Sequence, residues 1–154
     1  MIAFVDKEKI SDAAKVYMLS WKASHKNICS KEFIEKHNIE YMKNYLIKEI
    51  NTGYSLYAEY NAEKPVGIIG INLNTDEIGL LYVLPEEQRK GYGSDLLEFA
   101  LSQTNSPHLT VLNTNKAAIG LYEKYGFKFS GENKKLSPDK EIYEYKYVYQ
   151  SENI

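Results

Sequence analysis

One stretch, residues 80–97, constrains the fold of this chain more than any other. It reads Leu-Leu-Tyr-Val-Leu-Pro-Glu-Glu-Gln-Arg-Lys-Gly-Tyr-Gly-Ser-Asp-Leu-Leu. An apolar segment runs to Val83, a proline and a polar turn follow, and apolar residues then recur at helical spacing. This order predicts a strand, a loop and an amphipathic helix, with Gly91 and Gly93 at the point where the helix begins.

The loop before this helix has the chemistry of an anion-binding site. Backbone N–H groups at a helix N-terminus point outward and carry the positive end of the helix dipole. Gly91 and Gly93 permit positive φ and let a ligand reach the backbone, while Arg89 and Lys90 add positive charge. The alternative for the two cations is a solvated surface pair. We favour a phosphate role because the glycines supply a geometry that a random basic pair lacks.

Two better-known phosphate loops do not fit this sequence. The P-loop pattern G-x-x-x-x-G-K-[ST] does not occur, and the dinucleotide pattern needs a third glycine where this chain has Leu96. What remains is Gln-Arg-Lys-Gly-Tyr-Gly at residues 88–93. It resembles the Q/R-x-x-G-x-G/A signature of the GNAT superfamily of N-acetyltransferases, which hold the pyrophosphate of acetyl-CoA in this loop.

A second segment, residues 109–127, is similar to the other hallmark of that family. An apolar strand is followed by the pattern N-x-x-A-x-x-x-Y-x-x-x-G-F, which begins at Asn115 and ends at Phe127. Two motifs in the expected order and spacing arise by chance far less often than either alone. Together they cover roughly the second half of the chain, and the first half matches only by pattern.

The resemblance implies an α+β fold with a GNAT-like mixed β-sheet of about seven strands, flanked by about four helices. Its central parallel pair of strands splays apart and admits the pantetheine arm, whose amides satisfy backbone groups that have lost their ladder partners. We expect residues 1–150 to form a single domain and residues 151–154 to be a short C-terminal tail.

Hydrophobic periodicity and capping residues predict the individual elements. Ser11 is expected to cap a first helix, and Ser30 to cap one continuous helix over residues 32–50. In the last strand alternate tyrosines share one face, which packs on a helix or meets a second subunit in a homodimer. The other predicted ranges are strands 1–5, 54–60, 66–73, 77–83, 108–112, 127–130 and 142–149, and helices 94–103 and 116–125.

Composition narrows the classes of partner. The net charge is −2 and the basic residues form no stripe, so we expect no nucleic acid. The chain has neither an apolar run of membrane-spanning length nor the pattern of a signal peptide, which makes a cytoplasmic location the default. Cys29 is the only cysteine, and His25, His37 and His108 lack the spacing of a zinc helix, so we expect no metal.

The resemblance also implies which residues bind acetyl-CoA. The strand before the loop pairs with pantetheine through the backbone of Leu81, Tyr82 and Val83. Asn115 matches an asparagine that contacts the cofactor arm, and asparagine is also an excellent helix cap, so both roles can hold together. The loop residues assigned to the pyrophosphate are Gln88, Arg89, Lys90, Gly91, Tyr92, Gly93 and Ser94.

Catalysis must remove a proton from an ammonium, stabilise an oxyanion and protonate a thiolate. Tyr122 matches the tyrosine whose hydroxyl lies near the cofactor sulfur and protonates the departing thiolate. Glu77 is the candidate general base, because the histone-acetylating branch of the family carries its catalytic glutamate at this position. A backbone N–H around Val83 would meet the oxyanion.

The role of Glu77 has alternatives. It can be an ordinary charged residue at the start of a strand, although alternation would place it on one face with Leu81 and Val83. Another branch, which acts on protein N-termini, carries a glutamate where this chain has Thr110. Ordered water is the remaining proton acceptor.

The first two helices wall the acceptor site in the family, which suggests Tyr17, Trp21, His25 and Tyr41 as its lining. At helical spacing, however, Tyr17 and Trp21 are more often core residues. The sequence does not distinguish a polyamine, an aminoglycoside, an amino acid or a protein α-amine. The favoured function is transfer of acetyl from acetyl-CoA to a primary amine, and the alternative is a noncatalytic acyl-CoA-binding sensor or scaffold of the same fold.

Overall fold

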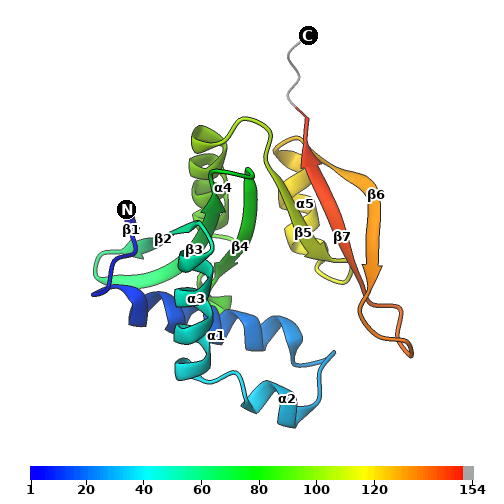
Figure 1. Cartoon of the computed structure of the whole chain (residues 1–154), viewed down its shortest axis with the longest axis horizontal. Helices are drawn as coiled ribbons and strands as arrows, with labels where there is room; N and C mark the ends of the chain where they lie inside the picture. The colour runs from blue at the N-terminus through cyan, green and yellow to red at the C-terminus, as the bar shows by residue number, and fades with distance from the viewer. Residues whose placement is uncertain (151–154) are drawn as a thin grey trace.

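Seven strands form one mixed sheet in the order β1-β2-β3-β4-β5-β7-β6 (Figure 1). This computed structural model describes residues 1–150, so the predicted tail lies outside the described residues. Only β4 and β5 run parallel; every other pair is antiparallel. The strands are β1 (Ile2–Phe4), β2 (Tyr54–Asn61), β3 (Lys64–Asn72), β4 (Glu77–Val83), β5 (His108–Leu112), β6 (Phe127–Lys135) and β7 (Tyr143–Tyr149).

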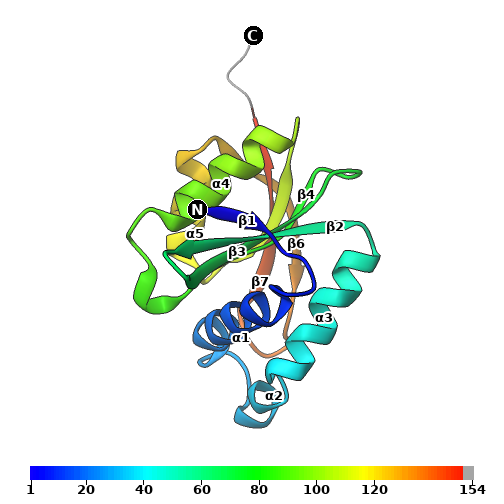
Figure 2. The ribbon, with the colours of Figure 1, turned by 90° about the vertical axis from the view of Figure 1, so that its left-hand side faces the viewer.

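Helices cover both faces of this sheet (Figure 2). The helices are α1 (Ile10–His25), α2 (Lys31–Glu35), α3 (Ile39–Asn51), α4 (Tyr92–Gln103) and α5 (Lys116–Lys124), with a short 3₁₀ turn, η1 (Pro85–Glu87). One apolar core lies between the sheet and α1 with α3, and a second lies between the sheet and α4 with α5. The α+β class with a central parallel pair is therefore confirmed.

The segment expected to be one helix over residues 32–50 is two helices, α2 and α3. Ser30 caps α2 as predicted, accepting a hydrogen bond from the N–H of Phe33 at 3.2 Å. Asn38 is extended and caps α3 through the N–H of Tyr41 at 2.9 Å. The break between the two helices places His37 against the ring of Trp21, where it is buried.

Two further elements differ from the sequence-based expectation. Ser11 does not cap α1, because the helix has already begun at Ile10; Asp6 instead accepts hydrogen bonds from the N–H groups of the two residues before the helix start. β6 extends to Lys135, well past the predicted end, because it pairs with β7 on both sides of a bulge. The tyrosine face of β7 packs within the chain, where Tyr147 is buried.

β4 and β5 are joined only at their starts. Glu77 lies opposite His108 and Ile78 opposite Leu109, and beyond these pairs the two strands diverge (Figure 1). The splayed parallel pair expected from the sequence is thus present. Each strand leaves unpaired backbone groups along the gap, which a ligand's amides can satisfy.

Asp76 fixes the closed end of this gap. Its carboxylate accepts hydrogen bonds from the N–H groups of Asn105 at 3.0 Å and Ser106 at 2.8 Å. Its carbonyl accepts from the N–H of His108 at 3.2 Å. The turn before β4 is therefore tied directly to the start of β5.

A β-bulge at Gly79 shifts the alternation of β4. Gly79 has no partner in the register with β3, so it is an extra residue on this strand. Ile78 consequently packs with Leu81 on the α4 and α5 face, while Leu80 packs on the α1 and α3 face. Glu77 therefore faces α1 and α3, not the side of Leu81 that strict alternation predicted.

Within residues 1–150, no helix is long and apolar enough to cross a membrane. The same part of the chain gathers no three histidine, cysteine, aspartate or glutamate side chains in an arrangement that could hold a metal ion. Cys29 is partly exposed, and its thiol is free.

Candidate functional site

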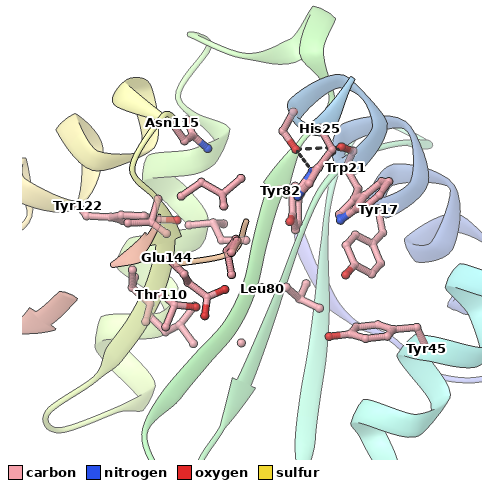
Figure 3. Close-up of a pocket in the computed structure, with 18 residues that line it drawn as sticks. Tyr17, Trp21, His25, Tyr45, Leu80, Tyr82, Thr110, Asn115, Tyr122 and Glu144 are labelled. Carbon is pink, nitrogen blue, oxygen red and sulfur yellow. Dashed lines mark hydrogen bonds between the residues drawn. The ribbon is translucent and has the colours of Figure 1, made fainter. Parts of the chain in front are cut away.

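A cavity of about 260 Å³ lies where β4 and β5 separate (Figure 3). A second cavity, of about 310 Å³, shares Ser24, Leu112 and Asn115 with the first and extends to Gln88 at the glycine loop. Because the two cavities share these residues, they lie side by side between the loop and the gap. The aromatic residues of the first cavity are Tyr17, Trp21, His25, Tyr45, Tyr82 and Tyr122.

One wall of the cavity comes from the last turns of α1. The indole of Trp21 is stacked between two imidazoles, His25 at 4.2 Å and His37 at 4.0 Å between ring centroids. Nδ1 of His25 lies 2.9 Å from the carbonyl oxygen of Trp21 and 2.8 Å from Oγ of Ser24. Burial lowers the pKa of His25, so the neutral imidazole is favoured.

Four tyrosine hydroxyls line the same cavity. Burial is the main cause that raises the pKa of Tyr17, Tyr45 and Tyr122, and it raises the pKa of Tyr82 to about 12. All four therefore keep their protons at neutral pH and can donate hydrogen bonds. Tyr122, on α5, is only 6% exposed and directs its hydroxyl into the space between the strands (Figure 3).

The remaining wall comes from β5 and β7. Tyr145 and Tyr147 pack into the core on the α5 side, so Glu144, the residue before Tyr145, points to the opposite face. Glu144 lies opposite Leu112 in the register with β5, and Thr110 is the next residue on that face of β5. Figure 3 shows the Glu144 carboxylate directed into the cavity beside Thr110.

The glycine loop has the geometry of an open helix N-terminus. Gly91 has φ of 94° and precedes α4 without a side-chain cap, so the first N–H groups of the helix lack protein partners. A Cβ added at Gly91 would meet nothing within 4 Å, whereas one at Gly93 would lie 3.3 Å from Leu121. Arg89 has φ of 65°, and Gln88 donates from Nε2 to the carbonyl of Val83 at 3.3 Å.

The two cations of the loop are not equivalent. Lys90 donates to the buried carboxylate of Glu87 at 3.0 Å, and Lys64 donates to the same carboxylate at 2.9 Å. These lysines lower the pKa of Glu87, Lys64 contributing most. Arg89 makes no ion pair with any residue in the range 1–150, so it is the cation of the loop that is free to meet an anion.

The structure brings most of the predicted residues together. Of the six residues predicted for catalysis or acceptor binding, two do not line the first cavity: Tyr41 is 46% exposed and its ring contacts His37 at a tilt, and Glu77 accepts a hydrogen bond from the hydroxyl of Tyr54. Val83 ends β4 between the cavity and the loop. The predicted residues that line the first cavity are Tyr17, Trp21, His25, Leu81, Tyr82, Asn115 and Tyr122.

Sequence reasoning missed four polar residues of this cavity: Ser24, Tyr45, Thr110 and Glu144. The alternation of the last strand does place Glu144 opposite the tyrosine face. Nothing in the sequence says that this face borders the gap, because that depends on β7 pairing with β5 rather than with another strand.

Residues 18–127 match a model of the Acetyltransferase (GNAT) family. No curated protein shows significant sequence similarity to the chain. Among solved structures, the PaiA N-acetyltransferase of Thermoplasma acidophilum, in complex with coenzyme A, superposes with a TM-score of 0.74 at 21% identity, covering 98% of each chain.

Two other structures are comparably similar. The ribosomal-protein-S18-alanine N-acetyltransferase of Escherichia coli has a TM-score of 0.73 at 19% identity, covering 100% of this chain and 97% of its own. YncA of Salmonella typhimurium, a putative acetyltransferase with its cofactor acetyl-CoA, has a TM-score of 0.72 at 16% identity, covering 99% and 95%. At these identities the likeness shows a shared fold.

Proposed function

The chain belongs to the GNAT family of acetyltransferases, and we propose that it transfers the acetyl group of acetyl-CoA to a primary amine. The observation that carries this proposal is the pair of adjacent cavities that reach from Gln88 in the glycine loop to the gap between β4 and β5. Together these cavities would hold the two ends of acetyl-CoA, with its phosphates at the loop and its thioester in the gap.

The loop supports binding of a pyrophosphate. Backbone N–H groups at residues 92–94 start α4 without a cap, and the open space at Gly91 lets phosphate oxygens approach them. In this proposal Arg89 supplies the free positive charge. Lys90 adds less because Glu87 already neutralises much of its charge.

The gap supports binding of the pantetheine arm. Leu81 and Tyr82 line the cavity beyond the last β4–β5 pair, so their strand has no neighbour on that side. Asn115 caps α5 by accepting from the N–H of Ala118 at 3.2 Å and lines both cavities. Its side-chain N–H₂ group remains able to donate to the arm.

The reaction places specific demands on these residues. The amine nitrogen attacks the thioester carbonyl, the C–N bond forms, the C–S bond breaks, and Tyr122 gives its proton to the thiolate. Leu84 donates to Val66 on β3 at 2.9 Å, so alternation turns the N–H of Val83 towards the gap, where it would stabilise the oxyanion. Glu77 can take the amine proton only through ordered water or Tyr54, since it lies outside the cavity.

Acetyl-CoA-dependent release of free thiol, measured against a panel of primary amines, tests this proposal, with calorimetry of acetyl-CoA binding in parallel. Turnover on any amine supports the proposed acetyltransferase activity. Binding without turnover on any amine favours the noncatalytic sensor, and absence of binding contradicts the assignment of the loop.

A pair of glycine variants tests the loop itself. Gly91→Val should weaken acetyl-CoA binding at least tenfold, because the side chain would occupy the space open to the phosphates. Gly131→Val is the matched control: Gly131 also has positive φ, 91°, and open space around its Cβ position, but it lies on β6. The control separates local backbone strain from loss of the phosphate site.

A further inference from the structure

Among the described residues that line the cavity, Glu144 is the only one with a carboxylate. Within residues 1–150 it makes neither a hydrogen bond nor an ion pair. Lys146, on the same face of β7, pairs with Glu132 at 3.3 Å. Lys134 is the neighbour of Glu144 in the register with β6, yet it is exposed and does not line the cavity. A partly buried carboxylate without a partner is unfavourable, so a cation should bind there.

The surroundings of Glu144 suit a cation as well. Tyr82 lies near enough that the carboxylate contributes to its raised pKa, and the rings of Tyr17 and Tyr45 face the same space (Figure 3). Neutral aromatic rings attract an ammonium through their faces, more strongly where water is excluded. No lysine or arginine lines this cavity, and the pKa of His25 is lowered. Among the described residues that line it, the cavity therefore favours a cation and offers no positively charged side chain to pair with an anion.

We propose that Glu144 receives the ammonium group of the acceptor and accepts its proton. The acceptor is then an aliphatic amine that carries no carboxylate anywhere on its chain, because a second carboxylate would enter the cavity without a cationic partner. This inference rests on the proposed function. It is distinct from the assignment of Glu77, which does not line the cavity and accepts a hydrogen bond from the hydroxyl of Tyr54.

The protons balance in this scheme. The ammonium gives one proton to Glu144, which returns it to solvent, and the neutral amine attacks the thioester carbon. As the C–S bond breaks, Tyr122 protonates the thiolate and is reprotonated by the second proton that the nitrogen loses. The products are the N-acetylated amine, free coenzyme A and one released proton.

Three variants test the role of Glu144. Glu144→Gln removes the charge at nearly constant volume, and Glu132→Gln removes a carboxylate from the same hairpin outside the cavity. Glu77→Gln tests the competing base. The probes are 1,5-diaminopentane and lysine, which differ by one carboxylate on the same carbon chain.

Turnover by Glu144→Gln on 1,5-diaminopentane should fall about 100-fold or more in kcat/KM, the loss expected for a general base. The affinity for acetyl-CoA should stay within about twofold for all three variants, which shows that they fold. Glu132→Gln should keep its activity, and the wild type should prefer 1,5-diaminopentane over lysine at least tenfold. Equal activity of Glu144→Gln and wild type, or equal use of the two probes, would overturn the inference.

A binding measurement separates this inference from the proposed function. In the presence of coenzyme A, calorimetry should show 1,5-diaminopentane bound at least tenfold more weakly by Glu144→Gln than by wild type. If the wild type turned over no amine but this difference persisted, the catalytic proposal would fail and the ammonium site would stand. Equal binding by the two proteins would remove the ammonium site whatever the turnover.

A pH profile adds a readout that a purely structural role would not move. The other titratable groups that face the cavity are Tyr17 and His25 from α1, Tyr45 from α3, Tyr82 from β4 and Tyr122 from α5. Lys134 on β6 is the nearest cation in the register. Loss of Glu144 should abolish the acidic limb of kcat/KM, while His25→Gln should retain it; the reverse result would assign the proton to His25.

Discussion

Burial sets the protonation state of Tyr122, and with it the role that this side chain can have. The phenol is 6% exposed, and burial raises its pKa, so it stays protonated through the neutral range. A protonated phenol can donate to a leaving thiolate but cannot act as a base. The same cause acts on Tyr17, Tyr45 and Tyr82, which makes this wall of the cavity a set of neutral donors.

Tyr122→Phe should therefore lower kcat by about 10²–10⁴-fold, because the thiolate loses its acid. Acetyl-CoA affinity should stay within about twofold, since the ring still fills its place. Tyr125→Phe is the control: its hydroxyl donates to Glu98 at 2.7 Å on the outer side of α5, away from the cavity. The rate of thiol release by each variant tests this prediction. Unchanged turnover in Tyr122→Phe would show that Tyr122 is not the acid.

Replacement by alanine should have opposite effects on stability at Gly79 and at Gly120. A Cβ at Gly79 would lie 2.4 Å from the ring of Tyr54, whereas a Cβ at Gly120 would meet nothing within 4 Å. Gly79→Ala should lower the free energy of unfolding by about 1–3 kcal/mol through overpacking. Gly120→Ala, in the middle of α5, should raise it by about 0.5–1 kcal/mol. Urea denaturation measures both, and a stabilised Gly79→Ala would contradict the contact with Tyr54.

Among the elements, the helices that wall the acceptor side depend on their caps. α3 begins only because Asn38 is extended and its side chain accepts from the N–H of Tyr41. The break before it lets His37 stack on Trp21, which is in turn stacked on His25 at the cavity. A helix boundary thus positions three stacked rings beside the site.

The caps give a paired prediction. Asn38→Ala should cost about 1 kcal/mol in the free energy of unfolding, because the start of α3 loses its capping acceptor. Ser11→Ala should cost nothing or stabilise slightly, because Ser11 lies inside α1, exposed, and caps no N–H. Both values come from urea denaturation, and a larger loss for Ser11→Ala would contradict the observed start of α1.

The turn before β4 makes the closed end of the gap sensitive to pH. Hydrogen bonds from the N–H groups of Ser106 and Asn105 lower the pKa of Asp76 below its ordinary 3.8. A carboxyl with a lowered folded pKa contributes stability above its unfolded pKa, and this contribution disappears as the pH falls through the folded value.

Asp76→Asn should therefore be less stable than wild type at pH 6, and the difference should shrink at pH 3. Asparagine keeps the tolerance for the φ of 61° at this position while removing the charge. Urea denaturation at the two pH values checks this, with exposed Asp139→Asn as the control. A difference that stayed constant with pH would show that the charge of Asp76 does not matter.

Across the whole molecule, the gap divides the sheet into two parts. In the described residues, β4 and β5 are joined by only two register pairs, and the two parts otherwise meet in the apolar core under α4 and α5. A ligand in the gap would contact both parts. Its binding should consequently stabilise the folded chain as a unit.

Acetyl-CoA at about 100 times its Kd should add about 2.7 kcal/mol to the free energy of unfolding. For a domain of this size, that gain corresponds to a rise in Tm of about 5–10 °C. Differential scanning calorimetry checks the shift, and Gly91→Val, which should bind at least tenfold more weakly, should show about half of it or less at the same concentration. A full shift in Gly91→Val would mean that the loop does not hold the ligand.

Local patterns were enough to predict much of this protein. Residues 80–97 determine a strand, a loop and a helix because apolar spacing, proline and glycine act within a few residues of each other. The same local signals predicted the cap at Asn115 and the α+β order of elements. The family motifs are local patterns too, and they pointed to Leu81, Tyr82, Asn115 and Tyr122, which line the cavity.

Contacts between distant segments decided the rest. The bulge at Gly79 arises from pairing with β3 and turns Glu77 to another face, and the break at Asn38 brings His37 onto Trp21, a contact between α1 and the α2–α3 connection. The place of Glu144 in the cavity depends on β7 lying beside β5. The sequence of each segment by itself sets its local conformation. Strand pairing and side-chain packing between segments decide which residues meet, because these interactions form only when the chain folds.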